Sequence, residues 1–187
     1  MDHRAVFNAL FPGFFSDAGI RALDRDHVFT ELALDLKRYT PRPPVPCPEG
    51  ITFGAYDGDM ELLRAAVRKV DGDWVKYFDG SGRYFAAFEG GRIVSFCILD
   101  EMGRCGEKRI GGPGCVGTLP EYRGHQIGLK MVQLATGILQ RRGFDIAYIH
   151  YTHIDHWYAK LGYKTVLRWN RDGVLWDQGD EAGADLS

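Results

Sequence analysis

Residues 118–128 read TLPEYRGHQIG and join two segments with different hydrophobic periods. An apolar strand is expected at Cys115–Leu119, so that it runs into the quoted stretch, and Pro120 ends it. From Ile127 the apolar residues recur in steps of four, three and four, which predicts an amphipathic helix that Gly143 caps. The quoted stretch is therefore the turn of a strand–turn–helix unit.

A turn of this kind is suited to bind an anion. The first N–H groups of any helix lack partners within the helix, and the helix dipole is positive at that end. Gly124 and Gly128 have no side chain that would keep a bulky anion away, and Arg123 adds a permanent positive charge. The turn therefore predicts a pyrophosphate site, although glycine at such a turn also serves steric relief alone. It matches neither the Walker pattern nor the dinucleotide pattern G-x-G-x-x-G.

The remaining pattern between residues 49 and 187 predicts alternating strands and helices. Helices are expected after Asp59 and Asp73, which can cap them, and over His153–Leu161. A glycine-rich loop is expected over Asp100–Gly114, and the acidic tail from Gly179 is expected to fray. The other expected strands are Ile51–Tyr56, Arg83–Phe88, Arg92–Leu99, Phe144–Tyr151, Tyr163–Trp169 and Val174–Trp176.

The first 40 residues carry apolar clusters whose period is ambiguous. Leu32, Leu34 and Leu36 alternate as in a strand, whereas Phe29, Leu32 and Leu36 fit one face of a helix. We expect helices in this segment. Five prolines follow between residues 41 and 48, and they predict a stiff, extended connector because each lacks an N–H and restricts the residue before it.

The chain length of 187 residues corresponds to about one domain. Residues 1–48 are expected to be an appended segment that ends in the proline-rich connector and crosses the surface of the main domain. Residues 49–187 are expected to form that main domain.

The composition excludes several classes of protein. The 23 Lys and Arg against 25 Asp and Glu give a net charge of −2, whereas nucleic-acid-binding domains are usually basic. No apolar run reaches the ~18 residues of a membrane-spanning helix, and the first residues lack the layout of a signal peptide. The 4 cysteines form no C-x-x-C pair, so free thiols in a reducing cytoplasm are expected.

The quoted stretch resembles the acetyl-CoA loop of the GCN5-related N-acetyltransferase (GNAT) superfamily, commonly seen as V-x-P-x-x-R-G-x-G-I-G. A second signature of that family, Tyr-x-x-Leu-Gly-Phe/Tyr, resembles Tyr158–Tyr163, which reads YAKLGY. Two signatures in the right order, separated by the expected helix and strand, are more specific than either alone. The resemblance covers roughly residues 51–176.

The resemblance implies a GNAT fold of the α/β (α+β) class. Its central sheet is mixed and mostly antiparallel, carries helices on both faces, and is splayed between the fourth and fifth strands, here Cys115–Leu119 and Phe144–Tyr151. It also implies an acetyl-CoA-dependent N-acetyltransferase in which a primary amine of a small molecule or peptide attacks directly in a ternary complex. No metal is implied, and a homodimer would be in keeping with the dimers common among members.

The site residues follow from the same resemblance. Tyr158 would protonate the departing CoA thiolate as the general acid, although an aromatic side chain that only packs between helix and sheet is the alternative. A backbone N–H near Gly117 or Thr118 would polarise the thioester carbonyl. The implied cofactor-binding residues are Val116, Gly117, Thr118, Arg123, Gly124, His125, Gln126, Ile127, Gly128 and Leu129.

The chain departs from the family pattern at three positions. Gln126 stands where the family usually has Gly, so its amide stays available if φ is negative, while its side chain could instead crowd the pyrophosphate. Thr118 replaces the usual Val, which is a mild change. Tyr151 stands where many members have an Asn that contacts the cofactor arm, and that role is not carried over.

The general base is the least determined part of the site. The candidates are His150, His153, Asp155, Asp100 and Glu101, and no spacing singles out one of them. We expect His150 to be the base because it lies next to the expected splay.

The absence of an obvious base, together with Gln126, leaves a second hypothesis open, a non-catalytic module that binds acyl-CoA. A metal site on His150, His153 and His156 is the third hypothesis. It is disfavoured because His150 is expected to end a strand, so the three side chains should diverge. O-acetylation also stays open, and the sequence does not identify the acceptor.

Overall fold

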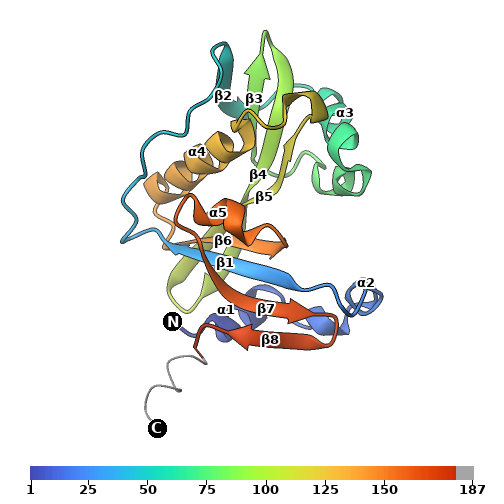
Figure 1. The fold of residues 1–187 in the computed structure, drawn as a ribbon, viewed down its shortest axis with the longest axis vertical. Helices are drawn as coiled ribbons and strands as arrows, with labels where there is room; N and C mark the ends of the chain where they lie inside the picture. Colours follow the sequence, from blue (N-terminus) through green and yellow to red (C-terminus); the bar gives the residue numbers. More distant parts are fainter. Residues whose placement is uncertain (180–187) are drawn as a thin grey trace. The chain divides into compact units, whose positions relative to one another are not determined.

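The structure, a computed structural model, describes residues 1–179. The prediction that the acidic tail frays falls almost entirely on residues 180–187, which lie outside the described residues. The strands (Figure 1) are β1 Phe29–Asp35, β2 Ile51–Tyr56, β3 Tyr84–Glu89, β4 Arg92–Cys105, β5 Lys108–Thr118, β6 Ile146–Thr152, β7 Lys164–Asn170 and β8 Gly173–Asp177. The helices are α1 His3–Leu10, α2 Ala18–Arg21, α3 Met60–Val70, α4 Ile127–Arg141 and α5 Asp155–Ala159, with short 3₁₀ helices η1 Phe14–Ser16, η2 Gly72–Tyr77 and η3 Pro120–Tyr122.

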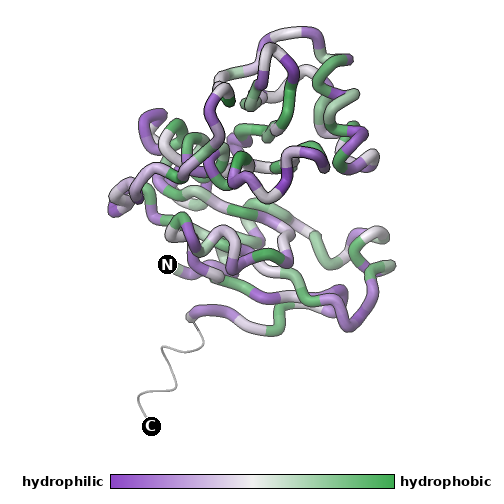
Figure 2. The backbone as a smooth tube through the Cα atoms, turned by 45° about the horizontal axis from the view of Figure 1, so that its top comes forward, coloured by the Kyte–Doolittle hydropathy of each residue, from purple (hydrophilic) through white to green (hydrophobic). Residues whose placement is uncertain are grey.

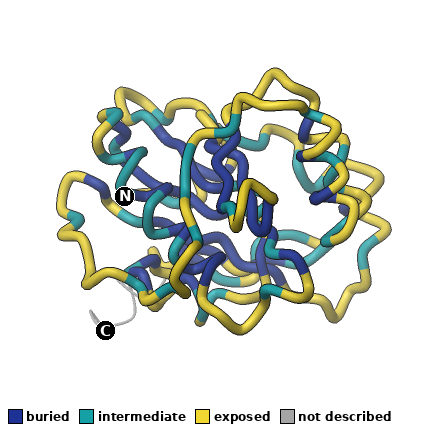
Figure 3. The backbone as a smooth tube through the Cα atoms, turned by 90° about the horizontal axis from the view of Figure 1, so that it is seen from above, coloured by how far each residue is buried: buried dark blue, intermediate teal, exposed yellow. Residues whose placement is uncertain are grey.

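Within the described part of the chain the strands form one 8-stranded sheet in the order β2-β3-β4-β5-β6-β1-β7-β8. The sheet is open and mostly antiparallel with one parallel pair, and the helices make the protein mixed α/β, which confirms the expected fold class. Hydrophobic residues, green in Figure 2, and buried residues, dark blue in Figure 3, recur along the strands, whereas most turns are exposed.

The chain divides into two compact units. Among the described residues, the first contains residues 1–39, 102–110 and 144–179, and the second contains residues 40–101 and 111–143. Strands β4 and β5 contribute residues to both units. The boundary expected at residue 48 stays a prediction. The splay also stays a prediction, since the two segments expected to form it, Cys115–Leu119 and Phe144–Tyr151, lie in different units.

In the second unit, α3 packs its apolar face against β3 and β4. Asp59 caps this helix, since its Oδ1 accepts a hydrogen bond of 2.8 Å from the N–H of Glu61. Leu63 and Val67 of α3 are fully buried in one cluster with Phe96 of β4. The helix expected after Asp59 is thereby confirmed.

The second unit also contains α4, which begins at the predicted residue, Ile127, and is 15 residues long. Ile127 and Met131 bury its apolar face in a cluster with side chains of β3 and β4. The side-chain amide of Gln133 accepts a hydrogen bond of 2.9 Å from the N–H of Val45 and donates one of 2.9 Å to the carbonyl of Pro43. These bonds fasten the proline-rich connector to α4.

Two local predictions are corrected. Asp100–Gly114 is not a loop, because β4 and β5 continue through it to a turn at Gly106-Glu107. Glycine weakens a strand without forbidding it, and pairing with the neighbouring strand overrides that local preference. The helix expected after Asp73 is the 3₁₀ helix η2, and Asp71 caps it by accepting a hydrogen bond of 2.9 Å from the N–H of Asp73.

In the first unit, residues 29–35 form strand β1 where helices were expected. β1 pairs antiparallel with β6 and with β7, for example through Ala33, which lies opposite Tyr148 on one side and Lys164 on the other (Figure 1). An interior strand covered on both faces loses the alternation of apolar and polar residues, and Phe29 to Ala33 are all buried. The local pattern could therefore not distinguish strand from helix, and this part of the N-terminal segment lies within the sheet.

Among residues 1–179 no helix combines the length and the apolar character that crossing a membrane would need. All four cysteines are free thiols, in agreement with their sequence spacing. Cys97 of β4 is buried, and burial raises the pKa of its thiol, so it acts as a core side chain rather than as a nucleophile.

The place of β1 can be tested with two leucines. Leu32 is 0% exposed, so Leu32→Ala is expected to lower the free energy of unfolding by about 2–5 kcal/mol through lost burial and a new cavity. The control Leu175→Ala on β8, where the side chain is 54% exposed, should change it by about 0.5 kcal/mol or less. Urea denaturation measures both, and equal small effects would show that β1 is not part of the core.

Candidate active site

The predicted anion site is the turn between β5 and α4. Arg123 begins it, donating from its backbone N–H to the Pro120 carbonyl at 3.2 Å and from Nε to the Thr118 carbonyl at 3.2 Å. Gly124, His125 and Arg123 are exposed, as is the next residue, Gln126. The turn is thus held by Arg123 while the surface of its backbone stays open.

The amides of the first turn of α4 precede its first internal hydrogen bond. That bond runs from the N–H of Lys130 to the carbonyl of Gln126 at 2.9 Å, so the N–H groups of residues 127–129 have no acceptor within the helix. Gln126 is the N-cap residue, and its side chain makes no capping hydrogen bond. Ile127, Gly128 and Leu129 are buried, which anchors this turn of the helix in the core.

The conformation of Gln126 differs from the one that the sequence analysis required. Its φ is +62°, in the left-handed region, and Gly124 two residues earlier has φ of +82°. A left-handed conformation costs an L-residue about 1–2 kcal/mol, which explains why glycine suits this position. Left-handed residues in such a turn direct backbone N–H groups into a concave anion site. The condition of a negative φ is therefore not met, while the amides remain uncapped.

The end of β5 leads into this turn and is held by β4. Ser95 donates a hydrogen bond of 2.6 Å to the carbonyl of Gly117, and its oxygen lies 3.0 Å from the hydroxyl of Thr118. A Cβ on Gly117 would lie 2.3 Å from the ring of Phe96, so this position requires glycine for steric reasons. Val116 is partly buried against the cluster that contains α4.

Asp100 of β4 faces an irregular part of β5. A Cβ on Gly114 would lie 2.8 Å from Oδ2 of Asp100, and the next residue, Cys115, has φ of +46°. Burial raises the pKa of the Asp100 carboxyl. Burial, with the Asp100 and Asp71 carboxylates nearby, raises the pKa of Cys115 to about 12, so this cysteine is a neutral thiol at pH 7. Asp100 is thus a predicted base of the second unit whose acidity is altered by burial.

The first unit contains the two predicted catalytic residues, His150 on β6 and Tyr158 on α5. Nδ1 of His150 lies 2.9 Å from Oε2 of Glu31, a residue of β1 that is 0% exposed. The ring of Phe11 is stacked on the imidazole with centroids 3.8 Å apart. Tyr158 is 7% exposed, and its ring packs edge-on to that of Trp157 at 4.8 Å.

Sequence reasoning missed Glu31, which lies 119 residues before His150. Its only signal was a carboxylate within the apolar run of residues 29–36. The other two histidines of the proposed metal site, His153 and His156, are exposed. Within residues 1–179 no group of three His, Cys, Asp or Glu side chains is arranged to hold a metal ion.

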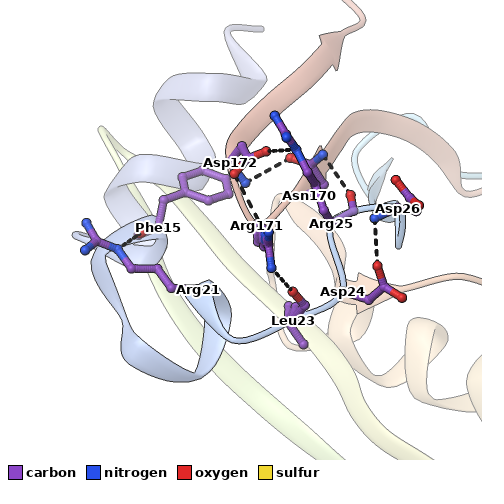
Figure 4. Close-up of polar contacts among 9 residues, drawn as sticks. All are labelled: Phe15, Arg21, Leu23, Asp24, Arg25, Asp26, Asn170, Arg171 and Asp172. Carbon is purple, nitrogen blue, oxygen red and sulfur yellow. Dashed lines mark hydrogen bonds and ion pairs between the residues drawn. The ribbon is translucent and has the colours of Figure 1, made fainter.

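A separate hollow of about 490 Å³ in the first unit is lined by Phe15, Arg21, Arg171 and Asp172. Figure 4 shows the two guanidinium groups pointing in different directions. Arg21 donates from Nε to the carbonyl of Phe15 at 3.2 Å, and Arg171 donates from Nη1 to the carbonyl of Leu23 at 3.0 Å. The arginines thus hold backbone segments, and none of the predicted site residues lines this hollow.

Residues 80–165 match the family model described as an acetyltransferase (GNAT) domain. Both quoted signatures, at residues 118–128 and 158–163, lie within this range. The resemblance to the GNAT superfamily is thereby confirmed. No match to a curated protein was found.

Solved structures share the fold. A glucosamine N-acetyltransferase region of a fungal multi-domain GH3 β-N-acetylglucosaminidase has a TM-score of 0.62 and 23% identity, covering 77% of this chain and 20% of that protein. A GCN5-related N-acetyltransferase from Sphaerobacter thermophilus has a TM-score of 0.59 and 22% identity, and the match covers 76% of this chain and 50% of that protein. A GCN5-related N-acetyltransferase from Kribbella flavida has a TM-score of 0.55 and 18% identity, and the match covers 75% of this chain and 55% of that protein. The chain thus spans between a fifth and about half of these proteins, and the likeness concerns the fold alone.

The left-handed conformation of Gln126 can be tested by substitution. Gln126→Val is expected to lower the free energy of unfolding by about 1 kcal/mol or more, since a β-branched residue tolerates this conformation poorly. Gln126→Asn, the matched control, should leave stability within about 0.5 kcal/mol because asparagine adopts the conformation more readily. Chemical denaturation measures both, and a Val variant as stable as the Asn variant would contradict the conformation.

Proposed function

We propose that this protein, whose residues 80–165 match the model of an acetyltransferase (GNAT) domain, is an acetyl-CoA-dependent N-acetyltransferase. The domain match supports acetyl transfer at the level of the family. The observation that carries the finer proposal is the exposed turn before α4, where three helix amides are uncapped beside Arg123. Such a turn fits a pyrophosphate, the group that links the two halves of CoA.

Different residues of the second unit would bind successive parts of acetyl-CoA. The amides of residues 124–129, with His125 and Arg123, would bind the pyrophosphate. The backbone of Val116, Gly117 and Thr118 would bind the pantetheine arm, much as a peptide adds to a strand. Acetyl-CoA supplies an activated thioester, and an N–H near Gly117 or Thr118 would stabilise the charge that develops on its carbonyl oxygen.

The proposed reaction is a direct attack in a ternary complex. The lone pair of a primary amine attacks the thioester carbon, a C–N bond forms and the C–S bond breaks. The amine loses a proton to a general base, and the CoA thiolate takes a proton from the hydroxyl of Tyr158. The base then releases its proton to solvent, and the phenolate of Tyr158 takes one up from solvent. The acceptor is a small-molecule or peptide amine, and an amino sugar belongs in the test panel because one structural relative is described as a glucosamine N-acetyltransferase.

Two residues are proposed as the base. His150 is the first, because a buried carboxylate holds its Nδ1. Asp100 is the second, because burial raises the pKa of its carboxyl, which makes the carboxylate a stronger base than an ordinary aspartate. The proposal further includes a reducing, cytoplasmic location, supported by the free cysteines, and a reaction that requires no metal or nucleic acid. A homodimer is compatible with it.

A non-catalytic acyl-CoA-binding module is the alternative proposal. Gln126 in place of the family's glycine supports it, because a side chain beside the pyrophosphate site weakens the match to an efficient transferase. Binding of acetyl-CoA without acetylation of any amine in a broad panel would favour this alternative.

Acetyl-CoA binding and the role of Tyr158 are tested together. At a concentration 100 times its Kd, acetyl-CoA should stabilise the protein by about 2.7 kcal/mol, seen as a higher Tm. Tyr158→Phe should keep that shift and lower kcat about 100-fold or more, since it removes the proton donor. Tyr163→Phe, the same change elsewhere in the signature, should retain turnover. A wild-type protein whose Tm does not respond to any acyl-CoA would refute the proposed function.

The two candidate bases are separated by the pH dependence of kcat/KM. A base must be deprotonated, so the rate falls as the pH drops through its pKa. If Asp100 is the base, its raised pKa places this fall above the range of an ordinary carboxyl, and Asp100→Asn abolishes the fall and most of the rate. If His150 is the base, His150→Gln has those effects and Asp100→Asn does not.

A further inference from the structure

Glu31 is a buried carboxylate that receives several hydrogen bonds. It is 0% exposed and lies in the interior strand β1. Its Oε1 accepts a hydrogen bond of 2.7 Å from Nε1 of Trp169 and one of 3.1 Å from the backbone N–H of Tyr151. Burying a charge costs several kcal/mol unless it is paired and hydrogen-bonded, so these donors are what makes the carboxylate tolerable there.

The backbone around Glu31 departs from regular pairing on both sides. The register of β1 with β6 shifts between Thr30 and Leu32, and its register with β7 shifts between Glu31 and Leu32. Tyr151 has φ of +58°, a left-handed conformation that is unfavourable for a bulky aromatic residue. Irregular strands of this kind redirect side chains and store strain where the arrangement has a use. Here the backbone N–H of Tyr151, the residue with the left-handed conformation, donates to Glu31.

The third donor to this carboxylate is His150. Its Nδ1 lies 3.0 and 2.9 Å from the two oxygens of Glu31. An ionised carboxylate only accepts hydrogen bonds, so Nδ1 must carry a hydrogen. In the neutral ring Nε2 then has the lone pair, and no described residue is a hydrogen-bond partner of Nε2. The side chain of His150 is 23% exposed, so this lone pair is accessible at least in part.

The plane of the imidazole is held by aromatic rings. Phe11 of α1 stacks on it with an angle of 16° between the planes, and Phe14 packs edge-on at 5.3 Å. Glu31 is a charged group in contact with the ring. Tyr148 is the other titratable group beside Glu31, and burial raises the pKa of its hydroxyl, with the Glu31 charge adding to the effect, so it remains neutral.

We propose that Glu31 is the positioning residue of His150, fixing the imidazole as the Nδ1–H tautomer so that Nε2 accepts the proton of the attacking amine. This proposal rests on the proposed N-acetyltransferase function. When the C–N bond forms, the proton moves from the amine nitrogen to Nε2, and the imidazolium is stabilised by the adjacent carboxylate. Glu31 does not take up the Nδ1 proton in this step, and the proton leaves to solvent from Nε2 after the product departs.

The first experiment needs no substitution of Glu31. In protein labelled with ¹⁵N-histidine, the neutral form of His150, assigned by comparison with His150→Gln, should show the shifts of an Nδ1–H, Nε2-unprotonated ring. A signal of the Nε2–H tautomer in the wild-type protein would overturn the proposal. This readout depends on neither activity nor the folding of a Glu31 variant.

The second experiment measures turnover of Glu31→Gln. Its glutamine keeps the size of the side chain but can donate to Nδ1, so the tautomer should become mixed and kcat should fall about 100-fold with KM for acetyl-CoA unchanged. The fall of kcat/KM at low pH should shift as well. Glu89→Gln, a change at an exposed carboxylate, should alter neither.

The outcomes distinguish failure of the positioning role of Glu31 from failure of the proposed N-acetyltransferase function. A folded Glu31→Gln variant with kcat within twofold of wild type overturns the positioning role, while an intact acetyl-CoA shift in Tm leaves the proposed function standing. A wild-type protein with no acyl-CoA shift refutes the function and, with it, the use of His150 as a base. Loss of turnover in both His150→Gln and Glu31→Gln, with the Nδ1–H tautomer in the wild type, supports the proposal.

Discussion

The unpaired amides at the start of α4 are the constraint on which the second unit depends. Those N–H groups cannot be satisfied by the helix itself, and Gln126 supplies no cap. The helix cannot shift to cover them, because Ile127 and Met131 are buried in the cluster that includes β3 and β4. The amides are therefore held rigidly at an exposed turn, which is the condition for binding an anion without a large cost of ordering the site.

The non-glycine residues with a left-handed backbone conformation lie in or beside the residues to which roles are proposed. Within residues 1–179 these are Cys115, Gln126 and Tyr151. Cys115 lies beside Asp100, Gln126 begins α4, and Tyr151 directs its N–H to Glu31. Strain of about 1–3 kcal/mol at each such position persists only where the surrounding structure enforces it. The core packing of each unit provides that enforcement, so stability and site geometry have the same origin.

The polar groups of the two proposed sites find their hydrogen-bond partners in different ways. In the second unit, the N–H groups at the start of α4 are left without a cap, next to the exposed residues 123–126. In the first, the Glu31 carboxylate is withdrawn from water and satisfied by three donors from β6 and β7. Uncapped amides at a helix start suit reversible binding of an anion, whereas a buried carboxylate suits the fixed orientation of one ring.

The amino-acid sequence alone determined α4, the turn before it and the cap of α3, since periodicity, glycine and side-chain caps act over a few residues. It could not assign residues 29–35 or 100–114, because burial on both faces and strand pairing override local preference there. Only the tertiary structure brought Glu31 to His150 and set the left-handed backbone of Gln126. The reason is physical: contacts across 119 residues and strained dihedral angles are enforced by packing, which no local pattern encodes.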